Sequence, residues 1–404
     1  MFETCRHCHS TDTIQFLDLG FAPPSNAYIS ESDTKRPEMY FPLKLFSCRN
    51  CRLVQTVDFA KEDELFTHDY AYFSSTSSSW IEHARQYSQK VIERFNLSNE
   101  SYVVEIASND GYLLKNFVEA EIPCLGVEPT QSTADAARLI GIDVLEEFFG
   151  EALAKRIEPA DLIIGNNVYA HVPDINDFTK GLACGLKPEG VVTLEFPHLL
   201  NLVKKNQFDT VYHEHYSYLS LLTVERIFVK NGLRIFDVEQ LPTHGGSLRI
   251  YACLDGANHE TGSTVAWMRE HEHAAKMHCD AFYTGFQEKA EQLKNRFLGF
   301  LLEAKAQGLT VAGYGAAAKG NTLINFAGVK PDLISFVCDA AEAKIGKYLP
   351  GSHIPILSPE YLKDTLPDVL ILFPWNIAEE ISEALSQYST IRKVVFVPDY
   401  REIL

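Results

Sequence analysis

The sequence carries little positive charge for its size. Its 404 residues include 36 lysines and arginines against 54 aspartates and glutamates, which gives a formal net charge of −18. A surface of this sign repels the phosphate backbone of nucleic acids. We therefore expect no nucleic-acid partner, and the length and composition fit a globular protein of two or three domains.

Long apolar runs are also missing. No run approaches the roughly 18 residues that a membrane span requires, and no signal-peptide pattern opens the chain. Five of the nine cysteines are scattered, and we interpret them as small buried apolar residues. We therefore expect a cytoplasmic monomer with no membrane partner.

The other four cysteines form two Cys-x-x-Cys pairs. Cys5 and Cys8 make the first pair, and Cys48 and Cys51 make the second. Four thiolates in this arrangement are typical of a tetrahedral zinc site, and four protein ligands leave no open position for a substrate. We predict a structural zinc at these residues. Two disulfides, or a spacing that arose by chance, are the alternatives.

The hydrophobic pattern divides the chain into three parts. Short apolar runs and a turn at residues 23–26 predict β-hairpins in a zinc-binding domain over residues 1–65. A doubly wound, mostly parallel α/β sheet is predicted over residues 66–255, because helical and strand-like segments alternate there. The predicted elements are a helix over 80–95 and strands over 101–106, 124–128, 161–165 and 190–196.

A second α/β domain is predicted over residues 256–404. Apolar side chains at helical spacing predict one long amphipathic helix over about 260–307 that joins the domains, with its stripe in the core. Further strand-like runs predict another doubly wound parallel sheet. These runs are residues 309–314, 333–338, 369–373 and 393–397.

The first functional element is the loop of residues 107–111. A buried strand ends at Glu105, and the small residues that follow lead into a helix, whose free amides suit a ligand. Glu128 ends the next strand, where an acid suits ribose hydroxyls. The dinucleotide pattern Gly-x-Gly-x-x-Gly is absent, and an adenosyl ligand without a diphosphate needs fewer glycines.

The second element is the 212–216 segment, Tyr-His-Glu-His-Tyr. If the segment is a strand, Tyr212, Glu214 and Tyr216 share one face and the two histidines share the other. A polar loop or a second metal site are the alternatives to catalysis. Histidine titrates near neutral pH, so it suits removal of a proton from carbon next to a ketone, and a tyrosine or a second histidine can stabilise the enolate oxygen.

The third element is the 313–321 loop, which follows a predicted strand and begins a predicted helix. Its glycines and free amides, together with Lys319, predict an anion cradle for a diphosphate. The alternatives are a plain helix start and a nicotinamide-binding loop of an NAD(P)-dependent nucleotide-sugar oxidoreductase. A non-catalytic zinc-ribbon module is a further alternative for the whole chain.

Residues 103–200 resemble a class I S-adenosylmethionine-dependent methyltransferase in the order of their strand, loop, Glu128 and the 161–167 run. Almost the whole chain resembles the nucleotide-sugar C-methyltransferase family, on segments 48–55, 212–218, 244–249 and 313–321. One departure is that Ala107 and Asn109 stand where the family often has glycine. The resemblance implies zinc and S-adenosylmethionine as cofactors, and an NDP-4-keto-deoxysugar, methylated at C-3 or C-5, as the small-molecule substrate.

The resemblance also implies roles for single residues. It places the base at His215, with Tyr212 and Glu214 around the sugar and His171 as a further catalytic contact. The implied cofactor-binding residues are Glu105, Ala107, Asn109, Gly111, Tyr112, Glu128, Asn166 and Asn167. The implied substrate-binding residues are Tyr72, His213, His244, Tyr314, Lys319 and Asn321.

Overall fold

The computed structural model describes residues 4–57, 74–76 and 78–403. The predicted substrate residue Tyr72 lies outside the described residues. Within them, none of the helices combines the length and the apolar character that crossing a membrane demands.

The N-terminal part is a four-stranded antiparallel sheet in the order β1-β2-β3-β9. Strands β1 (Thr13–Ala22), β2 (Phe41–Cys48) and β3 (Val54–Gln55) come from the predicted zinc-binding region. The edge strand β9 (Ser217–Tyr218) comes from far along the chain and pairs with β3. This pairing holds the segment just before β9, residues 212–216, against the N-terminal part.

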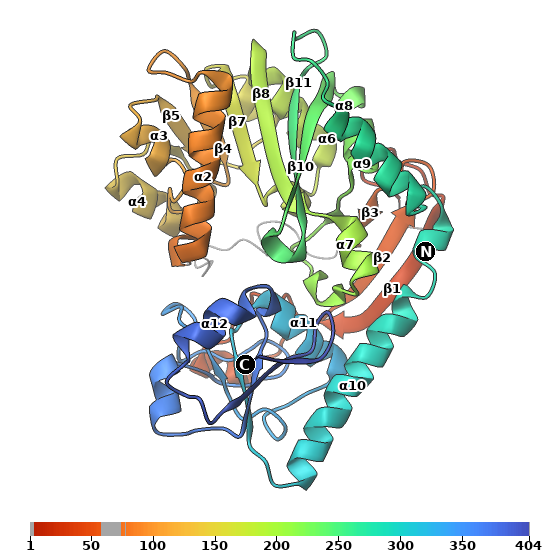
Figure 1. Ribbon diagram of the computed structural model, residues 1–404, viewed down its shortest axis with the longest axis vertical. Coiled ribbons are helices and arrows are strands. Elements are labelled where there is room, and N and C mark those ends of the chain that lie inside the picture. Colours follow the sequence, from red (N-terminus) through yellow and green to blue (C-terminus); the bar gives the residue numbers. More distant parts are fainter. Residues whose placement is uncertain (1–3, 58–73, 77, 404) are drawn as a thin grey trace.

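The central sheet has seven strands in the order β10-β11-β8-β7-β4-β5-β6 (Figure 1). Strands β4 to β8 run parallel, and β11 and β10 add an antiparallel edge. Their bounds are β4 (Val103–Ile106), β5 (Cys124–Val127), β6 (Val144–Leu145), β7 (Ala160–Asn166), β8 (Leu186–Pro197), β10 (Leu233–Leu241) and β11 (Ser247–Leu254). The α/β fold predicted for this part is confirmed.

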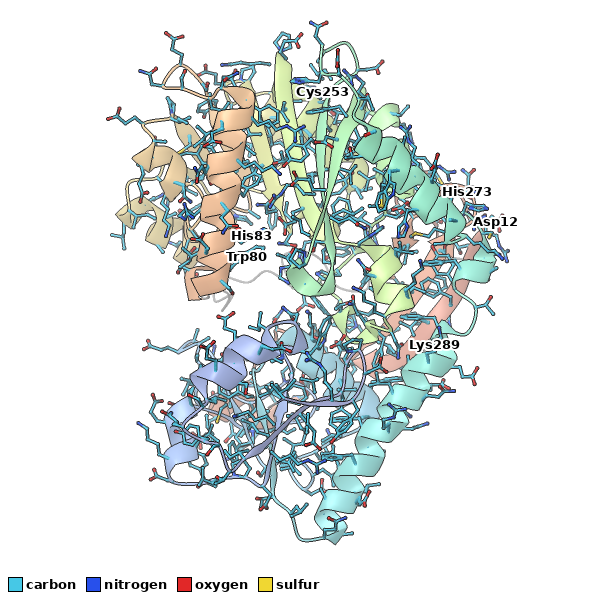
Figure 2. The ribbon with its side chains drawn as sticks, viewed as in Figure 1. Asp12, Trp80, His83, Cys253, His273 and Lys289 are labelled. Carbon is cyan, nitrogen blue, oxygen red and sulfur yellow. The ribbon has the colours of Figure 1, made fainter. Side chains whose placement is uncertain are left out.

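Helices cover this sheet on both faces. The predicted helix over 80–95 is α2 (Ser78–Phe95). The others are α3 (Lys115–Glu119), α4 (Gln131–Leu139), α5 (Glu151–Ala154), α6 (Ile175–Cys184), α7 (Leu199–Lys204) and α8 (Leu221–Lys230). Trp80 and His83 lie at the end of α2 nearer the C-terminal domain (Figure 2).

The prediction of one long helix over 260–307 is wrong. Two helices form, α9 (Ser263–Ala274) and α10 (Phe286–Ala306), because Lys276 and Gly285 take left-handed backbone angles, with φ of 64° and 80°. The segment between them is tied to the zinc-binding part, where Asp280 accepts from Arg49 and Arg52 at 2.7 and 2.9 Å. The apolar stripe of α10 is buried, as predicted.

The C-terminal sheet has six strands in the order β14-β13-β12-β15-β16-β17, parallel except for β17. Figure 1 shows it below the central sheet, with α10 running along one side of the molecule. The bounds are β12 (Val311–Tyr314), α11 (Ala318–Ala327), β13 (Val337–Cys338), β14 (Ile356–Leu357), β15 (Val369–Leu372), α12 (Ala378–Ala384), β16 (Arg392–Val395) and β17 (Arg401–Ile403).

The three parts share their cores. Cys5, Cys48 and Cys51 are buried in the same apolar cluster as strands of the central sheet. Residues of β1 and β2 pack in another cluster with α10 and the C-terminal sheet. The N-terminal part therefore joins the two larger sheets, although its own core is small.

Candidate active site and zinc centre

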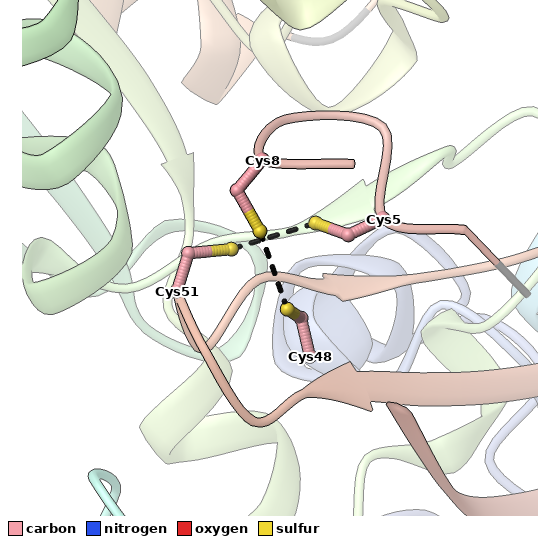
Figure 3. A group of neighbouring side chains, drawn as sticks. All are labelled: Cys5, Cys8, Cys48 and Cys51. Carbon is pink, nitrogen blue, oxygen red and sulfur yellow. Dashed lines mark hydrogen bonds between the residues drawn. The ribbon is translucent and has the colours of Figure 1, made fainter. Parts of the chain in front are cut away.

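The two Cys-x-x-Cys turns have matching backbones. In each, the residue after the second cysteine is left-handed, His9 with φ of 60° and Arg52 with φ of 67°. The amide of each donates to the carbonyl of the first cysteine, Cys5 or Cys48, at 2.9 and 2.8 Å. These matching turns aim all four thiols at one point (Figure 3).

The four sulfurs fit a zinc ion. All lie within 4.8 Å of one another, and the Cys5–Cys51 and Cys8–Cys48 sulfur pairs are 3.4 and 3.5 Å apart. A tetrahedron with zinc–sulfur bonds of about 2.3 Å has sulfurs about 3.8 Å apart, whereas a disulfide bond is about 2.05 Å. The disulfide alternative is not what forms, since all four are free thiols.

The loop after β4 has an unusual backbone. Ala107, Asn109 and Gly111 all take left-handed angles, with φ of 56°, 51° and 78°. Only the last is glycine, so the first two carry a strain of roughly 1 kcal/mol each. Strain of this kind persists where the surrounding structure holds a loop for a ligand. The predicted cofactor loop therefore has the backbone conformation of a glycine-rich loop, although two of these three residues are not glycine.

Two predicted cofactor residues are buried acids at strand ends. Glu128 accepts from the amides of Asn109 and Thr130 at 3.0 and 2.9 Å. Glu105 is 1% exposed, and its Oε2 has no hydrogen-bond partner among the described residues. Burial and the nearby charges of Asp110 and Glu128 raise the pKa of Glu105 well above its usual value.

Further unpartnered polar groups lie after β7. Asn167 has φ of 55°, and both polar atoms of its amide are buried without a partner among the described residues. The Oδ1 atoms of Asn166 and Asp110 are also buried and have no hydrogen-bond partner among the described residues. Tyr112 stacks on Trp80 with ring centroids 6.2 Å apart.

These groups fit S-adenosylmethionine. Three acids within electrostatic range of one another favour a cation, and this cofactor carries an ammonium and a sulfonium. The unpaired carboxylate and amide atoms also match its polar groups and ribose hydroxyls. Glu105, Glu128, Asn166 and Asn167 would hold it.

The 212–216 segment contains a turn, so the sharing of faces expected for a strand does not apply. The amide of His215 donates to the carbonyl of Tyr212 at 3.0 Å, which brings their side chains together. Nδ1 of His215 lies 3.2 Å from the Thr210 carbonyl, which can only accept, so Nδ1 carries the proton. Nε2 therefore accepts from the Tyr212 hydroxyl at 2.8 Å.

His171 lies against this pair, with its ring centroid 4.6 Å from that of His215. Its Nδ1 lies 2.8 Å from the carbonyl of Glu214, so Nδ1 is the protonated nitrogen and Nε2 carries the lone pair. Burial lowers the pKa of His171 to about 4, and burial and the nearby His171 lower the pKa of His215 well below its usual value. Both imidazoles are neutral at pH 7.

The structure directs the side chains of His213 and Glu214 away from His215. His213 contacts the backbone carbonyl of Phe41 at 3.2 Å through Nε2. Glu214 accepts from the backbone and side-chain amides of Asn26 at 3.1 and 3.2 Å, and its buried Oε2 has no partner among the described residues. Both side chains thus face the N-terminal part.

Sequence profiles and a relative identify the chain. A profile described as a zinc binding domain matches residues 5–66, a methyltransferase domain matches 80–238, and a C-methyltransferase C-terminal domain matches 242–398. The C-methyltransferase NovU of Streptomyces niveus is 35% identical over 407 residues, which cover 99% of this chain and 97% of that protein. The chain belongs to the C-methyltransferase family. It is an S-adenosylmethionine-dependent enzyme with a zinc-binding domain.

Solved structures of methyltransferases match part of this C-methyltransferase at low identity. Magnesium protoporphyrin IX methyltransferase (ChlM) from Synechocystis PCC 6803 has a TM-score of 0.36 and 15% identity, over 43% of this chain and 82% of that chain. A SAM dependent methyltransferase from Archaeoglobus fulgidus has a TM-score of 0.35 and 11% identity, over 42% and 93%.

In the C-methyltransferase, the 313–321 segment runs from the end of β12 into the first turn of α11, so the predicted turn from strand to helix is confirmed. A Cβ at Gly313, Gly315 or Gly320 would lie 2.3–2.6 Å from the side chains of Phe373 and Pro374. These glycines are therefore required by packing against the protein itself. Tyr314 is half-buried at the end of β12, and both amide atoms of the buried Asn321 lack a partner among the described residues.

Sequence reasoning missed the group that positions His244. Buried Glu195, in β8, accepts from Thr243 at 2.8 Å and Arg249 at 2.7 Å, and contacts His83 at 3.0 Å. His244 itself has φ of 53°, and its ring lies 5.2 Å from that of Trp80. The sequence did contain a signal for this group, since Glu195 is an acid within the mostly apolar predicted strand 190–196.

Proposed function

We propose that this C-methyltransferase methylates C-3 of an NDP-4-keto-6-deoxysugar through an enolate next to the C-4 ketone. Its place is then in the biosynthesis of unusual deoxysugars. The observation that carries the proposal is the buried Tyr212–His215 pair with its fixed tautomer. A ketone acidifies the neighbouring C–H bond, and a neutral imidazole whose Nε2 carries a lone pair is a suitable base for that proton.

His215 acts as the base in this proposal. The Thr210 carbonyl holds its Nδ1 proton, so Nε2 is the atom that takes the proton from C-3. The Tyr212 hydroxyl, which donates to Nε2 in the ligand-free structure, turns to the sugar when Nε2 is needed for the reaction. His171 lies beside the pair as a second neutral imidazole. The Oε2 atom of Glu214, which has no partner among the described residues, accepts from a sugar hydroxyl in this proposal.

S-adenosylmethionine, when bound, supplies an electrophilic methyl group on its sulfonium. The residues after β4, β5 and β7 hold it, and the 212–216 segment holds the acceptor. Keeping both in one site removes much of the entropic cost of bringing them together. Tyr314 and the unpaired amide of Asn321 support binding of the nucleotide portion at the C-terminal sheet.

The test is incubation with S-adenosylmethionine and a panel of TDP-, GDP- and CDP-4-keto-6-deoxysugars, with a mass gain of one methylene as the readout. His215→Asn is expected to bind both ligands and to lose about 10²–10⁴-fold in rate. It should also fail to exchange the C-3 hydrogen with deuterated water when adenosylhomocysteine replaces the methyl donor.

His213→Asn is the matched control, since His213 contacts Phe41 and not His215. Exchange should persist in this control. Near-normal exchange in His215→Asn, with loss in His213→Asn, would move the base to the other imidazole. Exchange at another ring carbon, such as C-5, would keep the chemistry and change the position.

A further inference from the structure

The side chain of Lys319 is held at the junction of the two larger sheets. Its Nζ donates to Oδ1 of Asn376 at 2.8 Å and lies 4.4 Å from the centre of the Trp375 ring. Both partners belong to the segment that follows β15, whereas Lys319 lies in the first turn of α11. An ammonium has three N–H groups, so this arrangement leaves at least one for a ligand.

An acid from the methyltransferase part completes this arrangement. Nε1 of Trp375 donates to Oδ2 of Asp209 at 2.7 Å. Asp209 is 2% exposed, and its Oδ1 has no partner among the described residues. The charges of Asp209 and Lys319 attract each other across the junction, since each favours the ionised form of the other.

The Lys319 ammonium lies within electrostatic range of the active-site histidines His215 and His244, whose pKa values are lowered chiefly by burial. The charge of Lys319 is a smaller cause that lowers the pKa of both. The Trp375 ring that supports it also packs on the backbone next to His244, because a Cβ at Gly245 would lie 2.4 Å from the indole. The cation is therefore presented to the site of methyl transfer by groups from both sheets.

We propose that Lys319 is a further catalytic residue, which stabilises the enolate oxygen of the acceptor, and that Asp209 and Trp375 position it. This inference rests on the proposed function. When the base removes the C-3 proton, the C–H electron pair forms the C-3–C-4 double bond and the carbonyl electrons move onto the C-4 oxygen. Lys319 stabilises that negative charge without giving up a proton. The enolate electron pair then forms the new bond from C-3 to the methyl group while the methyl–sulfur bond of the donor breaks, and the broken bond's electrons stay on the sulfur, which becomes a neutral thioether.

The environment of Lys319 supports a role that depends on its charge. Burial lowers the pKa of Lys319 to about 8, while the charge of Asp209 raises it. Asp209, His215 and His244 are the titratable groups that face it from the neighbouring elements. Activity should therefore fall as the pH rises through about 8, where the ammonium loses its proton.

The test compares the full-length variants Lys319→Met and Lys319→Arg with the unmodified enzyme. Exchange of the C-3 hydrogen is measured with TDP-4-keto-6-deoxyglucose and adenosylhomocysteine in deuterated water. Lys319→Met should lower the rates of C-3 exchange and of methyl transfer by about 10²-fold or more, whereas the affinity for TDP stays within about twofold. Lys319→Arg should restore part of the exchange and remove the alkaline limb near pH 8. Lys305→Met removes an exposed lysine of the same domain and should change neither quantity.

Two results would overturn the inference. One is normal exchange in Lys319→Met at saturating substrate, with a loss of TDP affinity, which would make Lys319 a phosphate ligand. The other is an alkaline limb unchanged in Lys319→Arg. Absence of exchange in the unmodified enzyme is a different result, because it would refute the proposed function itself. Asp209→Asn should shift the alkaline limb to lower pH, which a purely structural role in packing would not do.

Discussion

The loops after β4 and β12 are built on the same plan. Each follows the first strand of a parallel sheet, and an acid at the end of the neighbouring strand binds its backbone. Glu128 accepts from the amides of Asn109 and Thr130, and Asp339 accepts from those of Ala316 and Ala341 at 2.7 and 2.8 Å.

The two loops differ in what occupies the space beside them. The glycine-poor loop after β4 leaves the buried Glu105 and Asn167 without partners for their polar atoms among the described residues. The glycine-rich loop after β12 is filled by Phe373 and Pro374. The glycines of the second loop are therefore explained by packing and do not by themselves indicate a ligand. Asn321, at the start of α11, also has two buried amide atoms without a partner among the described residues. Buried polar atoms without partners are the better guide.

Replacing a glycine of the second loop should have the largest effect of the four changes considered. Gly315→Ala adds a Cβ 2.3 Å from the ring of Pro374 at φ of 86°, so it should lower the free energy of unfolding by about 3 kcal/mol. The measurement is denaturant unfolding. Gly328→Ala is the control, since Gly328 has φ of 68° in open space and should cost about 1 kcal/mol. Equal costs would show that packing does not require the glycine.

The two acids offer a matched pair of changes. Glu128→Ala should weaken binding of S-adenosylmethionine by about 1.5–3 kcal/mol, or tenfold and more, because it removes a buried acceptor. Asp339→Ala removes the equivalent acid of the other sheet and should leave this affinity unchanged. Calorimetry on both folded variants decides the matter. Equal losses would contradict the assignment of the cofactor to the first loop.

The dependence of stability on pH should reveal Glu105, the buried acid near the end of β4 that precedes the first loop. The pKa of Glu105 is raised in the folded state, so the protein without cofactor loses stability as the pH rises above the unfolded value of about 4.3. S-adenosylmethionine supplies a cation, so it should raise the melting temperature by a few degrees more at pH 7 than at pH 5.

Glu105→Gln is the control for this pH effect, because it removes the titrating group. In this variant, the rise in melting temperature caused by S-adenosylmethionine should be nearly the same at pH 5 and pH 7. A decline in stability between about pH 4 and pH 7 should remain in it, because burial raises the pKa of Asp209 to about 7. An unchanged cofactor effect in Glu105→Gln would place the cation elsewhere.

The smallest effect is expected at Ala107. Ala107→Gly relieves the left-handed strain but makes the unfolded chain more flexible, so stability should change by less than about 1 kcal/mol. Ala316→Gly, in the second loop, relieves no such strain and should lower the free energy of unfolding by about 0.5–1 kcal/mol. A large loss in Ala107→Gly would show that the methyl group itself contributes to the packing of the loop.

Much of the fold was predictable from local pattern. The Cys-x-x-Cys spacing, the strand-like apolar runs and the strand-to-helix turns all gave elements that the structure confirms. The break between α9 and α10 was not predictable, because Asp280 is drawn to Arg49 and Arg52 from the far end of the chain. Nor was the pairing of β9 with β3, since each is two residues long and depends on its partner.

The sequence by itself determined the chemistry that the chain can offer: four thiols in two matched turns, acids at strand ends, and imidazoles next to phenols. Only the tertiary structure decided which of these groups meet. In the folded protein His215 is hydrogen-bonded to Tyr212, whereas His213 contacts the backbone of Phe41. Asp209 accepts a hydrogen bond from Trp375, which is distant in the sequence. The physical reason is that spacing along the chain fixes local geometry, whereas burial and pairing between distant segments depend on how the sheets pack.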